Sequence, residues 1–327
     1  MKHILAGLFA FLFLGLVAAA DTVTPDAVVL QVTGSVMVQL PGQTTAVTLA
    51  EGAHIPQGAT IITGANSEAS IRPIGGVVST IKADTTVQIE KLSVTTDNGT
   101  VSNQTALISL LSGNLVSTLD PSKKHINNYG VRTPKGVAAA RGTIYGVHVD
   151  ASGSTFATLS GTVTITMADN RIITVSLGTG LILNDTSGAT AQATPISAAS
   201  PEVKAAVLEA ATTVINLVKE NLEPTTTAGA TTTLLAAVVQ AANAADPVAA
   251  QTLTTAAINA AQTNKTTSGT ADSSTQAIQQ AATQGASQNT TSFAPPGDDN
   301  SQNQQGNQNQ SNSPVTSIDT SVVSPSH

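Results

Sequence analysis

The 327-residue chain has no cysteine and no tryptophan, and aromatic residues make up only 2% of it. Without cysteine there is no disulfide framework, no thiol chemistry and no cysteine for lipid attachment. Three of the five phenylalanines lie in the first twenty residues. The core of the remaining chain must therefore be built from valine, isoleucine, leucine and alanine.

Charged residues are also scarce, at 10% of the chain with a net charge of −7. Nucleic-acid-binding proteins need a surplus of lysine and arginine, so this balance argues against nucleic acid as a partner. The chain lacks the Gly-x-Ser-x-Gly elbow of hydrolases, a phosphate-binding loop, a dinucleotide fingerprint and a cysteine nucleophile. We therefore predict no catalytic residue, no metal site and no cofactor.

The first twenty residues have the layout of a secretory signal. A positive Lys2 precedes an uninterrupted apolar run, and three alanines follow this run before Asp21. The apolar run is too short to cross a membrane comfortably. We predict a signal peptide at residues 1–20 that is cleaved after Ala20, with an uncleaved anchor as the alternative, and a mature chain without a transmembrane span.

Residues 27–184 have the pattern of short β-strands. Stretches such as VVLQVTGSVMVQL, TTVQIEKLSV and GTVTITM are rich in β-branched residues and mostly alternate, with Gly, Asn, Asp or Pro between them. The absence of a convincing helix here predicts a mainly β domain. Ser/Thr-Gly recurs between apolar segments at 33–36, 112–115 and 160–163, which favours strands stacked or wound into a solenoid-like roll.

Residues 195–289 form an Ala-rich region with helical patterning. Ser200, Pro201 and Glu202 supply an N-cap, a proline at the first helical position and an acidic first turn. Seams of alanine bury little area per turn, so these α-helices are expected to need a partner surface. The Gln/Asn/Ser/Pro tract at 290–327 lacks the apolar surface that would offset its ordering entropy, and we predict a disordered tail there.

The segment from Val28 to Leu183 resembles a FecR domain, the extracytoplasmic domain named after the regulator of ferric-citrate transport. The resemblance rests on VTGSVMV, GAHIPQGATIITGANSEASIRPIGG, TTVQIEKL, VRTPKGVAAARGTIYGVHV and FATLSGTVTI. It implies an all-β, solenoid-like roll with a role in recognition or signalling rather than catalysis. It also implies a bacterial origin.

The chain differs from the sigma-regulating members of this family. Those relatives carry a cytoplasmic anti-sigma segment and a membrane helix before the domain, whereas here a signal-like segment directly precedes it. We therefore expect no sigma factor as a partner. The expected location is the periplasm, the cell surface or the medium of a Gram-negative bacterium.

The most specific part of the resemblance is a short signature, which we interpret as structural. Its residues are Thr133, Pro134, Gly136, Arg141, Gly142 and Thr143. Pro134 restricts Thr133 to an extended geometry, and Gly136 permits a turn. The planar guanidinium of Arg141 is predicted to brace backbone carbonyls at the end of a strand.

An alternative interpretation gives the same stretch a binding role. Lys123, Lys124, Arg132 and Lys135, together with Arg141, would form a basic patch for an anionic partner such as a surface polysaccharide or an acidic lipid headgroup. Alternating strand geometry works against this patch, because neighbouring side chains point to opposite faces.

Enzymatic alternatives depend on residues without a clear pattern. His148 and Asp150 fall on one strand face, and His54 or His125 could extend them toward a metal site, although solvated surface positions are favoured. A carbohydrate-active enzyme would need a carboxylate pair. The available candidates are Glu51, Glu68, Asp84 and Glu90, and their spacing singles out no pair.

The sequence as a whole predicts an exported, non-enzymatic binding, scaffolding or signalling-related protein. Its partner would be an unidentified protein or glycan of the cell envelope. The alternative is an envelope polysaccharide-binding or adhesin-like protein that uses the basic loop.

Overall fold

A computed structural model describes residues 20–184, 191–225, 227–263 and 271–290. Within the described residues strands outnumber helices, at 43% against 29%, so the predicted mainly β class is confirmed. The proposed signal peptide and the polar tail lie almost entirely outside the described residues.

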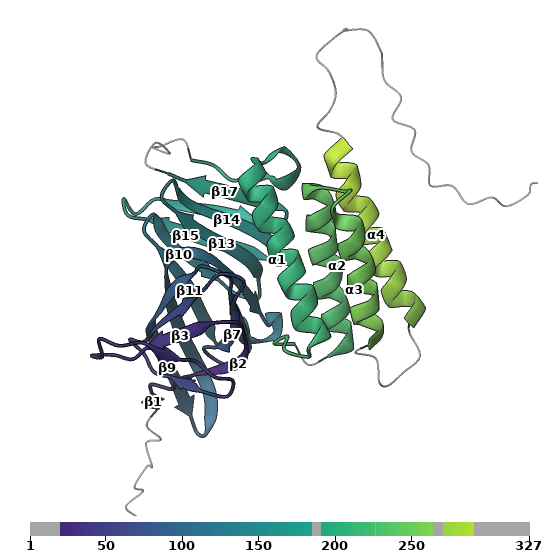
Figure 1. The fold of residues 1–327 in the computed structure, drawn as a ribbon. Helices are drawn as coiled ribbons and strands as arrows, with labels where there is room; N and C mark the ends of the chain where they lie inside the picture. Colours follow the sequence, from purple (N-terminus) through teal and green to yellow (C-terminus); the bar gives the residue numbers. More distant parts are fainter. Residues whose placement is uncertain (1–19, 185–190, 226, 264–270, 291–327) are drawn as a thin grey trace, which may run out of the picture. The chain divides into compact units, whose positions relative to one another are not determined.

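The strands fill the first two thirds of the chain and the helices follow them (Figure 1). In chain order the strands are β1 (Asp21–Val23), β2 (Ala27–Thr33), β3 (Val36–Gln39), β4 (Val47–Thr48), β5 (His54–Ile55), β6 (Thr60–Thr63), β7 (Glu68–Arg72), β8 (Val77–Ile81), β9 (Thr86–Asp97), β10 (Thr100–Leu119), β11 (Asn127–Thr133), β12 (Gly136–Ala140), β13 (Ile144–Asp150), β14 (Gly153–Ser160), β15 (Thr162–Met167), β16 (Ile172–Ser176), β17 (Thr179–Leu183) and β18 (Thr194–Pro195). Short 3₁₀ turns, η1 (Pro121–Lys123) and η2 (Ile196–Ala198), follow β10 and β18.

Hydrogen bonding arranges these strands in two sheets that share β10. Sheet A has the order β4-β3-β6-β9-β10-β11-β12-β15-β16, with β1 beside the end of β9. Sheet B has the order β5-β2-β7-β8-β10-β13-β14-β17-β18. Every described pairing is antiparallel except β10 with β11. The predicted solenoid is therefore not confirmed.

The three Ser/Thr-Gly repeats mark the places where the chain passes from one sheet to the other. Gly34 joins β2 of sheet B to β3 of sheet A, and Gly161 joins β14 of sheet B to β15 of sheet A. Gly113 lies where β10 itself leaves sheet A for sheet B. All three glycines have a positive φ, from 75° to 92°. The repeat thus encodes a recurring corner between two sheets.

The main core lies between the two sheets. Inward side chains from sheet A, such as Ile61 and Ile108, and from sheet B, such as Ile71 and Phe156, belong to one buried cluster. The cluster is dominated by valine, isoleucine and leucine, because the chain has so few aromatic residues. Alternation along each strand leaves every second residue for the opposite face.

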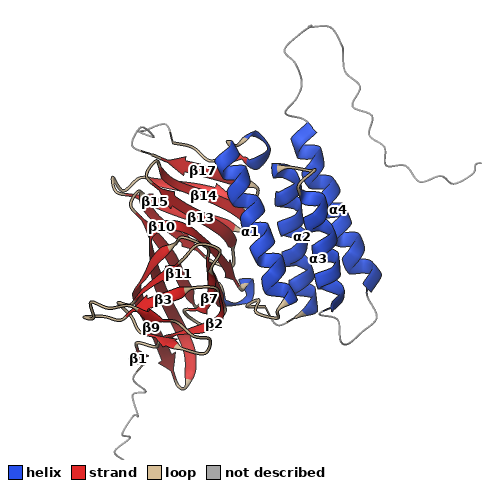
Figure 2. Cartoon of the chain, in the orientation of Figure 1, coloured by secondary structure: helices blue, strands red, loops and turns tan. Residues whose placement is uncertain are grey.

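Four helices follow the strands; the first two pack on the outer side of sheet B, and the other two pack on these helices (Figure 2). They are α1 (Pro201–Lys219), α2 (Ala228–Ala245), α3 (Ala250–Thr263) and α4 (Ala271–Thr290). The side-chain oxygen of Ser200 caps α1, as the sequence predicted. None of the helices in the described part of the chain is long and apolar enough to cross a membrane.

A second buried cluster joins these helices to the sheet. It combines Ile144 and Leu159 of sheet B with Val207 and Val214 of α1, and with residues of α2, α3 and α4. Close approach is possible because Gly146 has no side chain beneath α1, where an added Cβ would contact Ala210 at 3.4 Å. Sheet B is the partner surface that the thin alanine seams require.

Candidate functional site

The outer face of sheet A carries a hollow whose floor is made of very small side chains. One cross-strand row runs through six neighbouring strands and consists of Lys91, Leu107, Gly130, Ala139, Thr164 and Thr174. Along this row the side chains become smaller from leucine on β10 to glycine on β11 and alanine on β12, and they become larger again at β15. The resulting open cavity has a volume of about 570 Å³.

Two exposed cations line this hollow. Lys91 lies on β9, and Arg141 directly follows β12. The Arg141 guanidinium donates to Oδ1 of Asn128 at 2.6 Å, and Nδ2 of Asn128 donates to Oδ1 of Asn103 at 2.6 Å. Within the described residues, neither cation has a carboxylate within ion-pair distance. Both charges are therefore available to a ligand.

The other polar groups of the hollow are side-chain hydroxyls of Thr105, Thr162 and Thr164. The backbone offers almost nothing here, because β10, β11, β12 and β15 each pair with a strand on both sides. A ligand in the hollow would be recognised by side chains alone.

Most of the signature residues shape turns at the two ends of β12. Thr133 is buried, and its hydroxyl donates to the carbonyl of Gly136 at 3.1 Å across the turn that contains Pro134. Gly142 has a φ of 67°, and Thr143 is buried with its hydroxyl donating to the carbonyl of Thr162 at 3.1 Å. These contacts fit the structural interpretation of the signature.

Arg141 differs from its sequence-based prediction. The guanidinium is exposed and donates to the Asn128 side chain, where the sequence suggested a brace to backbone carbonyls. The strand already satisfies the neighbouring carbonyls through its ladder, so the guanidinium remains at the rim of the hollow.

The structure does not bring the predicted basic patch together. Lys123 and Lys124 lie at η1, before β11, whereas Lys135 lies in the turn after β11. A strand of seven residues separates these ends by roughly 20 Å. Arg132 forms an ion pair with Glu90, with 2.7 Å between Nε and Oε2, and this bond lowers the pKa of Glu90. Residues that are close in the sequence therefore do not form the single basic patch that was predicted.

Lys91 was missed because it lies far from Arg141 in the sequence. Only the register of β9, β10, β11 and β12 places both residues around one hollow. The available signal was the pair of small residues, Gly130 and Ala139, at outward positions of adjacent strands.

Comparison with known proteins finds a family likeness in the segment that carries this hollow. Residues 59–164 match the family model of the FecR protein. This segment is similar to the FecR protein family. The match includes every residue that lines the hollow, from Lys91 to Thr164. The family resemblance stated from the sequence is confirmed.

Solved structures offer a weaker likeness to this chain. Two crystal structures, at 1.65 and 2.50 Å resolution, are of a protein named "putative anti-sigma factor" from Parabacteroides distasonis ATCC 8503. Each is 14% identical with a TM-score of 0.34, and the likeness covers 42% of this chain and 59% of that protein. No curated protein gives a match.

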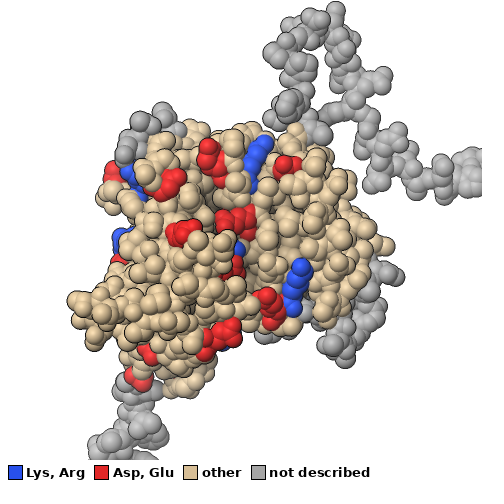
Figure 3. All heavy atoms as spheres, in the orientation of Figure 1, with Lys and Arg blue, Asp and Glu red and all other residues tan. Residues whose placement is uncertain are grey.

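A second cavity, of about 630 Å³, lies where sheet B meets α1 and is only partly formed by the FecR match. Its acidic side chains include Asp150, Glu202 and Glu209, and Figure 3 shows acidic residues along the boundary between the strands and α1. Hydrogen bonding by Ser152 lowers the pKa of Asp150 to about 2, whereas burial raises the pKa of Glu209.

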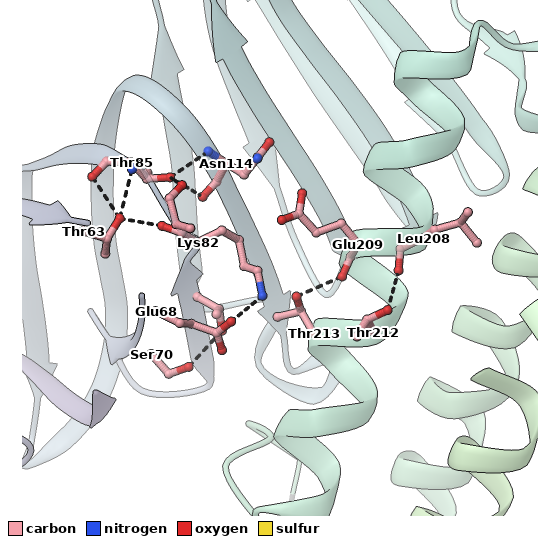
Figure 4. A network of polar contacts seen from close by, with 12 residues as sticks. Thr63, Glu68, Ser70, Lys82, Thr85, Asn114, Leu208, Glu209, Thr212 and Thr213 are labelled. Carbon is pink, nitrogen blue, oxygen red and sulfur yellow. Dashed lines mark hydrogen bonds and ion pairs between the residues drawn. The ribbon is translucent and has the colours of Figure 1, made fainter. Parts of the chain in front are cut away.

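His148 and Asp150, two of the residues considered for enzymatic roles, are engaged in hydrogen bonds beside this second cavity. Nδ1 of His148 lies 2.7 Å from Oδ1 of Asn114, and Nε2 lies 3.2 Å from Oδ2 of Asp150. Figure 4 shows Asn114 beside Thr85 and the ion pair of Lys82 with Glu68. Across the described ranges, no group of three or more His, Asp or Glu residues could hold a metal ion.

Proposed function

We propose that this chain is an exported, non-enzymatic binding or scaffolding protein with a signalling-related role, and that its FecR domain presents the outer face of sheet A to an envelope partner. The observation that carries the proposal is the hollow between Lys91 and Arg141, two exposed cations without a carboxylate partner in the described chain. Unpaired charges around a concave surface favour a complementary ligand.

The absence of an assembled reactive constellation in the described residues supports binding over catalysis. Glu68 pairs with Lys82, Glu90 pairs with Arg132, and Glu51 accepts a backbone hydrogen bond from Val32. Each carboxylate is thus engaged with a different partner, which does not favour the paired acid and base of a glycoside hydrolase.

Export is proposed from the signal-like leader, and its consequence can be tested directly. The strand β1 begins at Asp21, immediately after the proposed cleavage point. Envelope fractionation followed by N-terminal sequencing should yield a mature chain that begins at Asp21. A chain retained in the cytoplasm with Met1 intact would contradict the location.

The binding surface can be tested by site-specific photo-crosslinking in the native envelope. A crosslinker at Thr174, an exposed residue of β16 beside the hollow, should yield an adduct with an envelope component. The control position is Thr255, an exposed residue of α3. Identical adducts from both positions, or none from either, would contradict the proposed function.

A further inference from the structure

We propose that the hollow on the outer face of sheet A binds a linear polysaccharide that carries carboxylate groups. This inference rests on the proposed function and names the ligand class for the same surface. Four observations lead to it: the charges of the hollow, its hydrogen-bonding groups, its floor and the acidic lining of the second cavity.

The two cations set the length and the charge of the ligand. Three inter-strand steps separate β9 from β12, so the backbones of Lys91 and Arg141 are roughly 15 Å apart. A ligand that places one anionic group at each cation carries at least two such groups along an extended chain. The fixed fork of the Arg141 guanidinium matches the two oxygens of a carboxylate.

The hydrogen-bonding groups favour a sugar over a peptide. An extended peptide gains its affinity by adding a strand to a free sheet edge, but the hollow lies on strands that are paired on both sides. The groups that remain are the hydroxyls of Thr105, Thr162 and Thr164 and the amide of Asn128. Such groups suit a ligand rich in hydroxyl and carboxylate oxygens.

The floor of the hollow is apolar and built from small residues, with Leu107 beside Gly130. Gly130 and Ala139 lie side by side on β11 and β12, and Ala139 is exposed. This floor can receive the apolar face of a sugar ring. The described outer face carries no aromatic platform, since Tyr129, Tyr145 and Phe156 are buried. Charge must therefore supply much of the affinity, and binding must weaken as salt is added.

The second cavity would repel the same ligand. Asp150, Glu202 and Glu209 line it beside α1, and like charges disfavour a polyanion at close range. A linear acidic polysaccharide is thus directed to sheet A, and the helices remain free of it.

The test is a titration of the full chain with polygalacturonate, compared across charge-reversal variants. Arg141→Glu and Lys91→Glu should each weaken binding by about tenfold, because charge-assisted hydrogen bonds are replaced by repulsion. Lys124→Glu is the matched control, since it makes the same charge change at an exposed lysine of the FecR domain outside the hollow. This control should bind like the parent.

A second pair of variants separates shape from charge. Ala139→Leu fills the floor without altering charge and should weaken binding by a similar factor, whereas Ala139→Ser should leave binding unchanged. Circular dichroism melts establish that each variant is folded, and a folded Ala139→Leu protein is expected because Ala139 is exposed.

Three results would overturn the inference. The first is that polygalacturonate does not bind. The second is that the Lys124→Glu control loses as much affinity as Arg141→Glu. The third is that poly-glutamate binds with the same sensitivity to the hollow variants. If the Thr174 crosslinker still captures an envelope component in these cases, the ligand class fails and the proposed function stands. Loss of both signals defeats both proposals.

Discussion

Tyr129 of sheet A and Ser117 of sheet B meet across the core, with 2.8 Å between their hydroxyl oxygens. The same Tyr129 hydroxyl lies 2.7 Å from Oγ of Ser79. Tyr145 packs edge-to-face against Tyr129, with ring centroids 6.5 Å apart. The Tyr145 hydroxyl is also buried, but it has no hydrogen-bond partner within the described residues. One tyrosine therefore joins the two sheets through polar contacts, and the other fills space.

This difference predicts opposite outcomes for two identical substitutions. Tyr129→Phe should lower the free energy of unfolding by about 1 to 3 kcal/mol, because two buried serine hydroxyls lose their partner. Tyr145→Phe should be neutral or slightly stabilising, since it removes a buried hydroxyl without a bond. Urea unfolding of both variants measures the contrast. Equal losses would contradict the assigned hydrogen bonds.

The tyrosines also predict how stability depends on alkaline pH. Burial raises the pKa of Tyr129 to about 12 and raises that of Tyr145 well above its usual value of 10.0. The folded chain therefore holds these protons longer than the unfolded chain does. Stability is complete below pH 10 and should fall by about 1 kcal/mol per pH unit and per tyrosine from pH 10 toward pH 12.

Near-ultraviolet absorbance can follow this titration, because the chain has only two tyrosines and no tryptophan. We expect tyrosinate to appear in one steep step that coincides with the loss of circular dichroism. A gradual titration centred near pH 10 in a folded protein would show that the phenols are accessible.

The corners between the sheets predict a graded cost for alanine. Gly113 has a φ of 92°, and a Cβ there would lie 2.6 Å from Cα of Thr85. Gly178 has a φ of 72° with nothing within 4 Å of an added Cβ. Gly178→Ala should cost about 1 to 2 kcal/mol through backbone strain alone. Gly113→Ala should cost clearly more, because the corner must also open.

Thermal melts of these two variants provide the comparison. If Gly113→Ala is no less stable than Gly178→Ala, the corner is not tightly packed against the turn at Thr85, and the repeat would have no packing role.

Local features of the fold could be predicted from the sequence, and long-range pairing could not. The cap of α1 was predictable because Ser200, Pro201 and Glu202 act within a single turn. The Ser/Thr-Gly repeat could be recognised as a set of turns, since a positive φ favours glycine wherever it occurs. The repeat does not state which sheet each following strand joins, because that choice depends on partners many residues away.

The candidate site illustrates the same limit. Basic residues close in sequence, Lys124 and Lys135, are placed at opposite ends of β11. Lys91 and Arg141 are 50 positions apart in the sequence and face one hollow. Burial patterns predict which face a side chain takes, but register between strands decides which side chains become neighbours.

Two residues of the signature have different roles: Thr143 stabilises the fold, and Arg141 lies at the surface. Their different contributions to the free energy of unfolding can be measured. Thr143 is fully buried and bonds the carbonyl of Thr162, whereas Arg141 is exposed. Thr143→Val should lower the free energy of unfolding by about 1 to 3 kcal/mol, because the carbonyl loses its donor, and Thr143→Ser should recover part of that loss. Arg141→Ala should change it by no more than about 0.5 kcal/mol. Urea unfolding tests all three variants, and a large loss for Arg141→Ala would return this arginine to a bracing role and remove the physical basis for assigning its charge to a ligand.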